Sequence, residues 1–216
     1  MNQLTEGIRV IYQSTIRMER EQVIYFDPYG VKEPAQDADI IFITHDHYDH
    51  FSPEDLAKVC KADTKIVLPE KMASKAKNIP FSDDQMIQVQ PEQHYECFGL
   101  RFQTVPAYNH LKPFHPKRSG WTGYLLEWGG SAYYIAGDTD VTKENQMLKC
   151  DAAFLPIGGT YTMNAKEAAK LANIIHPQVV VPIHYGCIVG ERKDADVFEN
   201  MLEPGIACIK LMEFGE

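Results

Sequence analysis

The stretch Thr44-His45-Asp46-His47-Tyr48-Asp49-His50-Phe51 places three histidines and two aspartates within six residues. Imidazole nitrogens and carboxylate oxygens are ligands that zinc, iron and manganese accept. The apolar run Asp39–Thr44 precedes the stretch and predicts a buried strand. Ser52-Pro53-Glu54-Asp55 follows it and is typical of a helix start, with a cap, a proline at the first helical position and acids in the first turn. The sequence therefore predicts a metal-binding loop between a core strand and a helix.

The pattern His45-x-His47-x-Asp49-His50 resembles the signature of the metallo-β-lactamase superfamily. In that family two histidines bind one metal ion, and the aspartate and the last histidine bind a second ion. The resemblance implies that His45 and His47 hold the first ion and that Asp49 and His50 hold the second. Two ions need more ligands than these four residues supply, so further ligands are expected later in the chain.

Two later strand ends resemble the positions of other superfamily ligands. Ala136-Gly137-Asp138 follows an apolar run, and Asp138 matches the aspartate that bridges the two ions in the family. Asp140 is the alternative, although it can also cap a turn or a helix. His184, which follows a second apolar run, resembles the family's final metal histidine.

The third ligand of the first ion is the point at which the chain departs from the family pattern. The family has a histidine after a middle strand, whereas Ala107-Tyr108-Asn109-His110 ends that strand here. We prefer His115, because the subgroup that this chain resembles has an Ala-Tyr-Asn followed by a Phe-His-Pro. Asn109 and His110 are the alternatives, and an enzyme with a single ion stays open.

Other segments recur in the same order in one branch of the superfamily. These are Tyr25–Pro28, Tyr134–Asp140, Pro156–Met163 and His184–Gly186. The branch contains bacterial metal-dependent hydrolases related to L-ascorbate 6-phosphate lactonase and to the phospholipase D that cleaves N-acylphosphatidylethanolamine. The resemblance covers nearly the whole chain and implies a single domain, residues 1–216, with the α+β fold of a four-layer αββα sandwich.

Periodicity alone supports only an α/β or α+β fold. It predicts a helix over Pro53–Cys60, another capped by Asn164 with Glu167 three residues later, a last helix over Asp194–Leu202 and a last strand over Ile206–Met212.

The composition is that of a soluble globular protein. The 216 residues carry a net charge of −9, and 44% of them are hydrophobic. The acidic balance disfavours general nucleic-acid binding, and no apolar run reaches the roughly 18 residues that predict a transmembrane helix. The five cysteines include no Cys-x-x-Cys pair, and the first residues lack the plan of a signal peptide. These features predict free thiols and a cytoplasmic location; the oligomeric state is not indicated.

The resemblance also implies the chemistry, in which a metal-bound hydroxide attacks the substrate and two divalent ions, zinc or else manganese or iron, are the cofactors. Asp49 is a candidate to accept or relay a proton. Tyr161 and Tyr185 are candidate donors to the substrate or to the developing oxyanion, with packing beside the sheet edge as the alternative. Lys117 and Arg118 lie in a basic loop that would border the site if His115 binds metal; they would hold the charged end of a substrate, unless the loop is simply solvated.

The predicted function is therefore metal-dependent hydrolysis of a small anionic ester, lactone or phosphodiester. The alternatives are a nucleic-acid-processing nuclease of the same superfamily and a non-catalytic metal-dependent binding module. The acidic composition weighs against the nuclease, and the nearly complete ligand set weighs against the binding module. The expected partner is a small molecule, without nucleic acid or membrane.

Overall fold

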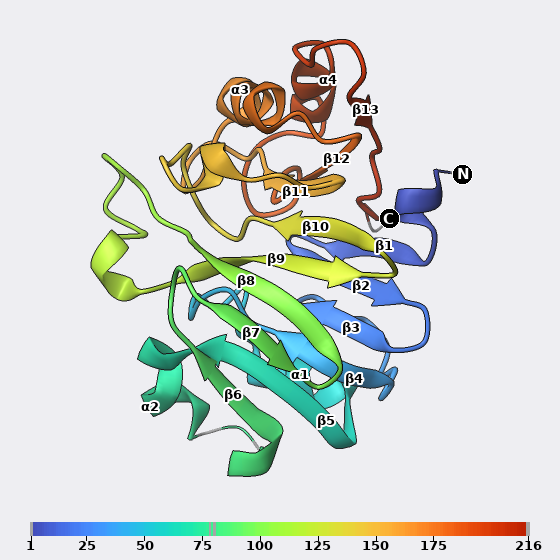
Figure 1. Ribbon diagram of the computed structural model, residues 1–216, viewed down its shortest axis with the longest axis vertical. Helices are drawn as coiled ribbons and strands as arrows, with labels where there is room; N and C mark the ends of the chain where they lie inside the picture. The colour runs from blue at the N-terminus through green and yellow to red at the C-terminus, as the bar shows by residue number, and fades with distance from the viewer. Residues whose placement is uncertain (1, 78, 80, 215–216) are drawn as a thin grey trace.

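Two β-sheets pack face to face, and helices cover their outer faces in the computed structural model of this chain (Figure 1). The structure describes residues 2–77, 79 and 81–214. The remaining residues, which include both ends of the predicted domain range, lie outside the described part.

The first sheet combines an antiparallel start with a parallel continuation. In spatial order it contains β1 (Ile8–Tyr12), β2 (Thr15–Glu19), β3 (Val23–Phe26), β4 (Ala38–Phe42), β5 (Cys60–Pro69) and β6 (Met86–Val89). The β1–β2 and β2–β3 pairs are antiparallel, and the pairs from β3 to β6 are parallel.

The second sheet has the same mixed character, and its antiparallel pairs again come before its parallel pairs along the chain. In spatial order it contains β13 (Ala207–Cys208), β12 (Val179–Ile183), β11 (Ala152–Pro156), β10 (Ser131–Ile135), β9 (Thr122–Trp128), β8 (Leu100–Pro106) and β7 (His94–Cys97). The pairs from β7 to β10 are antiparallel, and those from β10 to β13 are parallel.

The side chains of β4 show how the layers form. Successive strand residues point to opposite faces. Ile40 and Phe42 belong to the buried cluster shared with the second sheet, where the Phe42 ring packs edge-on against Tyr124 at 5.0 Å. Ile41 and Ile43 belong to the cluster on the outer face. A strand that is apolar on both faces must be covered on both, as the apolar run in the sequence predicted.

The helices supply the two outer layers. They are α1 (Pro53–Val59), α2 (Ala73–Ala76), α3 (Ala165–Ile175) and α4 (Asp194–Glu199). The first two bury apolar side chains in the outer cluster of the first sheet, and the last two bury theirs beside the second sheet. Figure 1 shows α3 and α4 together at the end of the molecule formed by β11 and β12. The predicted αββα sandwich is confirmed.

The predicted helix starts are confirmed, whereas some predicted ends are too long. The Ser52 hydroxyl caps α1 by accepting from the Asp55 amide at 3.2 Å, and the Asn164 side chain accepts from the Glu167 amide at 3.0 Å in a complete capping box. However, α1 ends at Val59, because the chain enters β5 at Cys60.

The C-terminal segment differs most from the sequence prediction. The last helix ends at Glu199 rather than Leu202, and the last strand covers only Ala207–Cys208. After Cys208 the chain leaves the second sheet and reaches the first, where Met212 bridges to Val10. The sequence predicts a single strand here, because the apolar pattern does not indicate that the segment pairs first with one sheet and then with the other. No helix in the described residues has both the length and the apolar character needed to cross a membrane.

Candidate metal centre

Four loops that follow strand ends meet at one point. The loop after β4 carries His45, His47, Asp49 and His50, as the sequence predicted. The segments after β8, β10 and β12 bring the other members, which are His115, Asp138 and His184 respectively. All of these side chains except His47 are buried. These buried side chains are only 0–7% exposed. Burying polar and charged groups to this extent is costly unless they interact with a partner of opposite charge or with a metal ion.

The histidines and carboxylates form groups whose potential ligand atoms lie within 4.8 Å of one another. One group is His45, His47, His115 and Asp138; another is Asp49, His50 and His184; a third is Asp27, His45 and His50. The first two match the ligand sets that the superfamily resemblance implied for two ions. The third shares its histidines with them, and Asp27 has its oxygens engaged elsewhere.

Asp138 lies between the first two groups. Its carboxylate is 3.3 Å from His115 Nε2 in one group, and 3.2 and 3.3 Å from the Nε2 atoms of His50 and His184 in the other. Gly137 makes this approach possible: its φ is +63°, and a Cβ there would lie 3.0 Å from the Thr44 side chain. A carboxylate in this position can contact two ions at once.

Hydrogen bonds behind the cluster determine which nitrogen of His45 is free. The Thr44 hydroxyl donates to Asp27 Oδ2 at 2.6 Å and lies 3.0 Å from His45 Nδ1. Since the hydroxyl has only one proton, His45 Nδ1 must be the donor in the second contact. The Nε2 lone pair of His45 then faces the cluster, which is the form that binds a metal.

Two other histidines are oriented in the same way. His50 Nδ1 donates to Asp27 Oδ2 at 2.7 Å. His115 Nδ1 donates to Asn109 Oδ1 at 2.8 Å, because the Asn109 amide nitrogen is already donating to Asp140 and to a backbone carbonyl. Outer partners of this kind are typical of metal-binding histidines, whose orientation and basicity they control.

The buried atoms that face inward show that a metal fits this site. The Nε2 atoms of His50, His115 and His184 and Oδ1 of Asp138 have no hydrogen-bond partner among the described residues. Buried polar atoms without partners are costly, and each of these has a lone pair of the kind that a divalent ion accepts. The donor set of imidazoles with carboxylates suits zinc, manganese or iron.

The pKa values describe the same cluster without its ion. Burial, followed by the neighbouring imidazoles, lowers the pKa of His45 and His47. Burial opposes the charge on Asp138, yet His184 and His50 hold its pKa well below the usual value. Burial also opposes protonation of His184, but Asp138 raises the pKa of that imidazole to about 9. Burial and the attraction between imidazoles and carboxylates thus act against each other in this cluster, and a bound metal would compete with protons for the imidazole nitrogens.

Gln13 is a site residue that the sequence analysis missed. It lies in the turn between β1 and β2, is fully buried, and has a φ of +50°. Its amide nitrogen donates to Asp49 Oδ2 at 3.3 Å, and its backbone carbonyl accepts from the His184 amide at 2.8 Å. Gln13 thus contacts two members of the second group. A lone glutamine in a hairpin turn carries no sequence signal for this role.

Trp121 is a second missed residue. Its indole packs 4.9 to 5.4 Å from the rings of His45, His47 and His115, measured between centroids. The indole therefore forms an apolar wall against the first group and limits the rotation of these three imidazoles.

The sequence left open the third ligand of the first ion and the identity of the shared aspartate, and the structure distinguishes between the candidates by their positions. His115 lies in the cluster, whereas His110 is exposed and its Nε2 contacts the Val141 carbonyl at 3.0 Å. Asn109 contacts His115 from behind: its side-chain oxygen accepts from His115 Nδ1, and its amide nitrogen donates to Asp140 and to the Tyr161 carbonyl. Asp140 accepts from Asn109 and from the His110 amide, so it holds this loop in place while Asp138 faces the ligands.

A cavity of about 780 Å³ opens over the cluster, and we call it the metal-facing cavity. It is lined by Asp46, His47, Tyr48, Asp49, Phe51, Pro53, Lys75, Phe114, Asp138, Tyr161 and Ile188. The predicted catalytic residues Asp49 and Tyr161 are therefore at this cavity. The structure does not bring Tyr185 there: its ring is buried against Phe214, with centroids 5.5 Å apart, as the alternative reading of this tyrosine expected.

The predicted anion-binding residues Lys117 and Arg118 do not line the metal-facing cavity, although Phe114 of the same loop does. The Lys117 ammonium pairs with Glu144 at 2.7 Å and lies 4.9 Å from the Tyr108 ring centroid. Neither Lys117 nor the exposed Arg118 lines the cavity, and Lys112 is held by Asp140. Although His115 reaches the cluster, the lysines on either side of it, Lys112 and Lys117, pair with Asp140 and Glu144 on neighbouring segments. The geometry therefore favours the structural reading of this loop.

An αββα sandwich with a buried histidine–aspartate cluster at its strand ends defines the class of metallo-β-lactamase-fold proteins. A family model of the beta-lactamase superfamily domain matches residues 10–184. The chain belongs to this superfamily, which confirms the resemblance seen in the sequence.

Similar proteins come from archaea and bacteria. A UPF0173 metal-dependent hydrolase of Thermococcus onnurineus is 30% identical over 209 residues, covering 90% of this chain and 91% of the relative. Another from Thermus thermophilus is 31% identical over 196 residues, covering 85% of each chain. The structure of a metallo hydrolase from Ignicoccus hospitalis has a TM-score of 0.75 at 24% identity and covers 95% of each chain, which shows a shared fold. The relatives from Thermococcus onnurineus and Thermus thermophilus are named metal-dependent hydrolases, which is the enzyme class predicted from the sequence.

Proposed function

We propose that this protein is a hydrolase that binds two divalent ions, zinc in the first instance, and cleaves a small ester, lactone or phosphodiester. The observation that carries the proposal is the position of Asp138 between two ligand groups, within 3.2 to 3.3 Å of three imidazole Nε2 atoms that lack hydrogen-bond partners. The names of the relatives support hydrolysis. Lactones and phosphodiesters are included because of the sequence resemblance to the lactonase and phospholipase D branch.

The geometry supports the proposed ligand sets. His45, His47 and His115 would hold the first ion, and Asp49, His50 and His184 the second, with Asp138 shared. Ions bound there would lower the pKa of a water molecule and polarise the carbonyl or phosphoryl oxygen of the substrate.

The chain's own residues would position the substrate and move the proton. Asp49 borders both the cluster and the metal-facing cavity, so its carboxylate can accept a proton from a water or return one to the leaving group. The Gln13 amide, 3.3 Å from Asp49 Oδ2, restricts the carboxylate to one orientation. Tyr161 borders the same cavity and can donate a hydrogen bond to the substrate.

The test combines metal analysis with a substrate screen. Purified protein is assayed for zinc, manganese and iron, and then with p-nitrophenyl acetate, γ-butyrolactone, bis-p-nitrophenyl phosphate and a single-stranded RNA. We expect close to two ions per chain and hydrolysis of at least one small substrate that chelation abolishes and metal restores. Cleavage of the RNA alone would instead support a nuclease, and metal binding without any hydrolysis would support a binding module.

A further inference from the structure

The walls of the metal-facing cavity are mainly aromatic and apolar. Tyr48 and Phe114 are 64% and 42% exposed, which is unusual for large apolar side chains. The Phe114 ring packs edge-on against Tyr161 at 4.6 Å, so these two rings form one wall. Phe51 and Ile188 add further apolar surface. Exposed apolar surface around a concave site is typical of ligand contact.

The charged groups at the rim do not offer a site for an anion. Lys75 is the one cation among the described lining residues, and its ammonium pairs with the Asp46 carboxylate at 2.8 Å and donates to the Asp46 carbonyl at 3.1 Å. In the loop that contains His115, Lys112 pairs with Asp140 and Lys117 pairs with Glu144. An anionic substrate would therefore have to break an existing ion pair to gain a cation.

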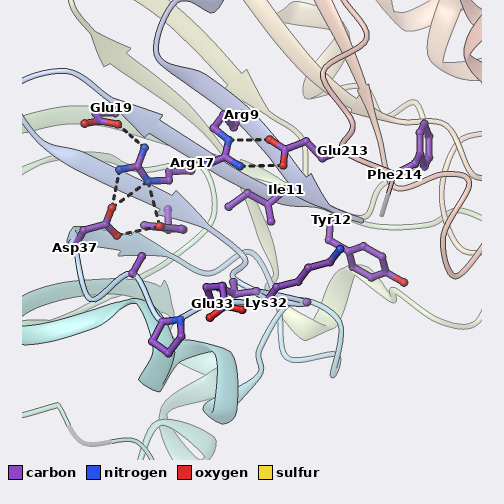
Figure 2. A pocket seen from close by; sticks show the side chains of 15 residues that line it. Arg9, Ile11, Tyr12, Arg17, Glu19, Lys32, Glu33, Asp37, Glu213 and Phe214 are labelled. Atoms are coloured by element: carbon purple, nitrogen blue, oxygen red, sulfur yellow. Dashed lines mark hydrogen bonds and ion pairs between the residues drawn. The ribbon is translucent and has the colours of Figure 1, made fainter. Parts of the chain in front are cut away.

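A second large cavity is lined by more charged side chains than the metal-facing cavity. It has a volume of about 940 Å³ and lies beside β1, β2 and the C-terminal segment (Figure 2). Figure 2 shows Arg9 paired with Glu213, and Arg17 paired with Asp37. These guanidinium groups are already satisfied, and none of the ligand groups formed by described residues borders this cavity. The metal-facing cavity is lined by His47, Asp49 and Asp138 of the cluster, so a substrate that reacts there would approach through it.

We propose that the metal-facing cavity selects a neutral substrate with an apolar group, such as a phenyl ring or a short alkyl chain, that packs against Tyr48, Phe114 and Tyr161. This inference rests on the proposed function, since the scissile group must lie at the metal ions. It narrows the substrate class to neutral esters or lactones with an apolar substituent. The volume of about 780 Å³ accommodates such a molecule.

The test uses three hydroxamates, because a hydroxamate binds a metal ion whether or not the enzyme turns over a given ester. Binding of acetohydroxamate, benzohydroxamate and 4-carboxybenzohydroxamate to the zinc-loaded protein is measured by isothermal titration calorimetry. We expect benzohydroxamate to bind about tenfold more tightly than acetohydroxamate, because its ring leaves water for the aromatic wall. The carboxylated ring should lose most of this advantage.

Two variants test whether Phe114 is responsible for the preference for benzohydroxamate. Phe114→Ala should reduce the preference for benzohydroxamate to about threefold or less, while Leu111→Ala should retain it, since Leu111 is 97% exposed and does not line the cavity. Equal affinity for the methyl and phenyl probes, or tightest binding of the carboxylated probe, would overturn the inference but leave the metal site intact. Failure of acetohydroxamate itself to bind would instead overturn the proposed function, and this inference with it.

Discussion

Replacing Asn109 by alanine is expected to weaken metal binding by about 10- to 100-fold, because an outer partner that orients a metal histidine is worth about that much. Asn109 is buried, and its carbonyl oxygen accepts from His115 Nδ1 at 2.8 Å. Without it the His115 ring can rotate, and its Nδ1 proton loses its partner. The expected loss corresponds to about 1.4 to 2.7 kcal/mol of binding free energy.

The same substitution should also lower stability, and the two effects can be separated. The Asn109 amide donates to Asp140 at 3.1 Å and to the Tyr161 carbonyl at 3.0 Å. Leaving such buried groups unpaired costs about 1–3 kcal/mol. At about 2–4 °C per kcal/mol for a domain of this size, the metal-free variant should melt several degrees below the metal-free wild type. Melting is followed by circular dichroism.

Asn109→Asp tests orientation apart from stability. The carboxylate keeps an acceptor for His115 but cannot donate to Tyr161 and repels Asp140. We expect zinc affinity to stay within about threefold of wild type, because the outer acceptor is retained, while the melting temperature falls. Affinity is measured by competition with a chromogenic zinc chelator.

Asn145→Ala provides the matched control. Asn145 is also buried, donates to the Asp140 carbonyl at 2.9 Å and accepts from the Thr142 amide at 2.9 Å, but it contacts no histidine of the cluster. It should lose stability and keep its zinc affinity. The reasoning fails if Asn109→Ala binds zinc as tightly as wild type, or if Asn145→Ala weakens zinc binding equally.

Further outcomes follow from the same geometry. His45→Ala and His47→Ala should deplete metal and abolish hydrolysis while the far-ultraviolet spectrum stays native; full metal occupancy in the double variant would refute the ligand assignment. His115→Ala should lower metal content and His110→Ala should not, as measured by elemental analysis. Chelation should lower the melting temperature, since an ion held at 100 times its Kd contributes about 2.7 kcal/mol; an unchanged melting curve would argue against binding. Gln13→Ala should reduce kcat more than it raises KM, provided that Asp49 moves a proton; wild-type kcat in Gln13→Met, which fills a similar volume without an N–H donor, would point to a packing role.

The candidate ligand residues could be picked out from the sequence because they follow strand ends in recognisable patterns. His45 to His50 lie between an apolar run and a capped helix, and Asp138 and His184 each follow an apolar run of their own. Strand ends that share an edge bring such loops together, so the sequence order alone indicates proximity. The alternation of β4 between two apolar clusters was likewise visible as a continuous apolar run.

The outer partners were less predictable, because they depend on contacts between distant segments. Asp27 lies 23 residues from His50, yet its carboxylate accepts from that histidine at 2.7 Å. The only sequence signal was the Tyr-Phe-Asp-Pro segment, which recurs in the branch but carries no assigned role. Lys117 shows the same limit: a basic residue near a candidate ligand suggested an anion site, but its ammonium pairs with Glu144 on another segment.

The backbone around the cluster leads us to expect that the fold forms without the metal. Gln13, Asp27 and His184 have φ values of +50°, +44° and +56°, which non-glycine residues rarely adopt and which cost roughly 1–3 kcal/mol each. Such conformations persist only where the surrounding structure determines them, and here each residue is anchored to a strand of the sandwich whose core contains Phe26 and Phe42 stacked at 4.9 Å. The inter-sheet core therefore compensates the strain before any ion binds. Loss of a ligand such as His45 should then remove the ion while the sandwich remains folded.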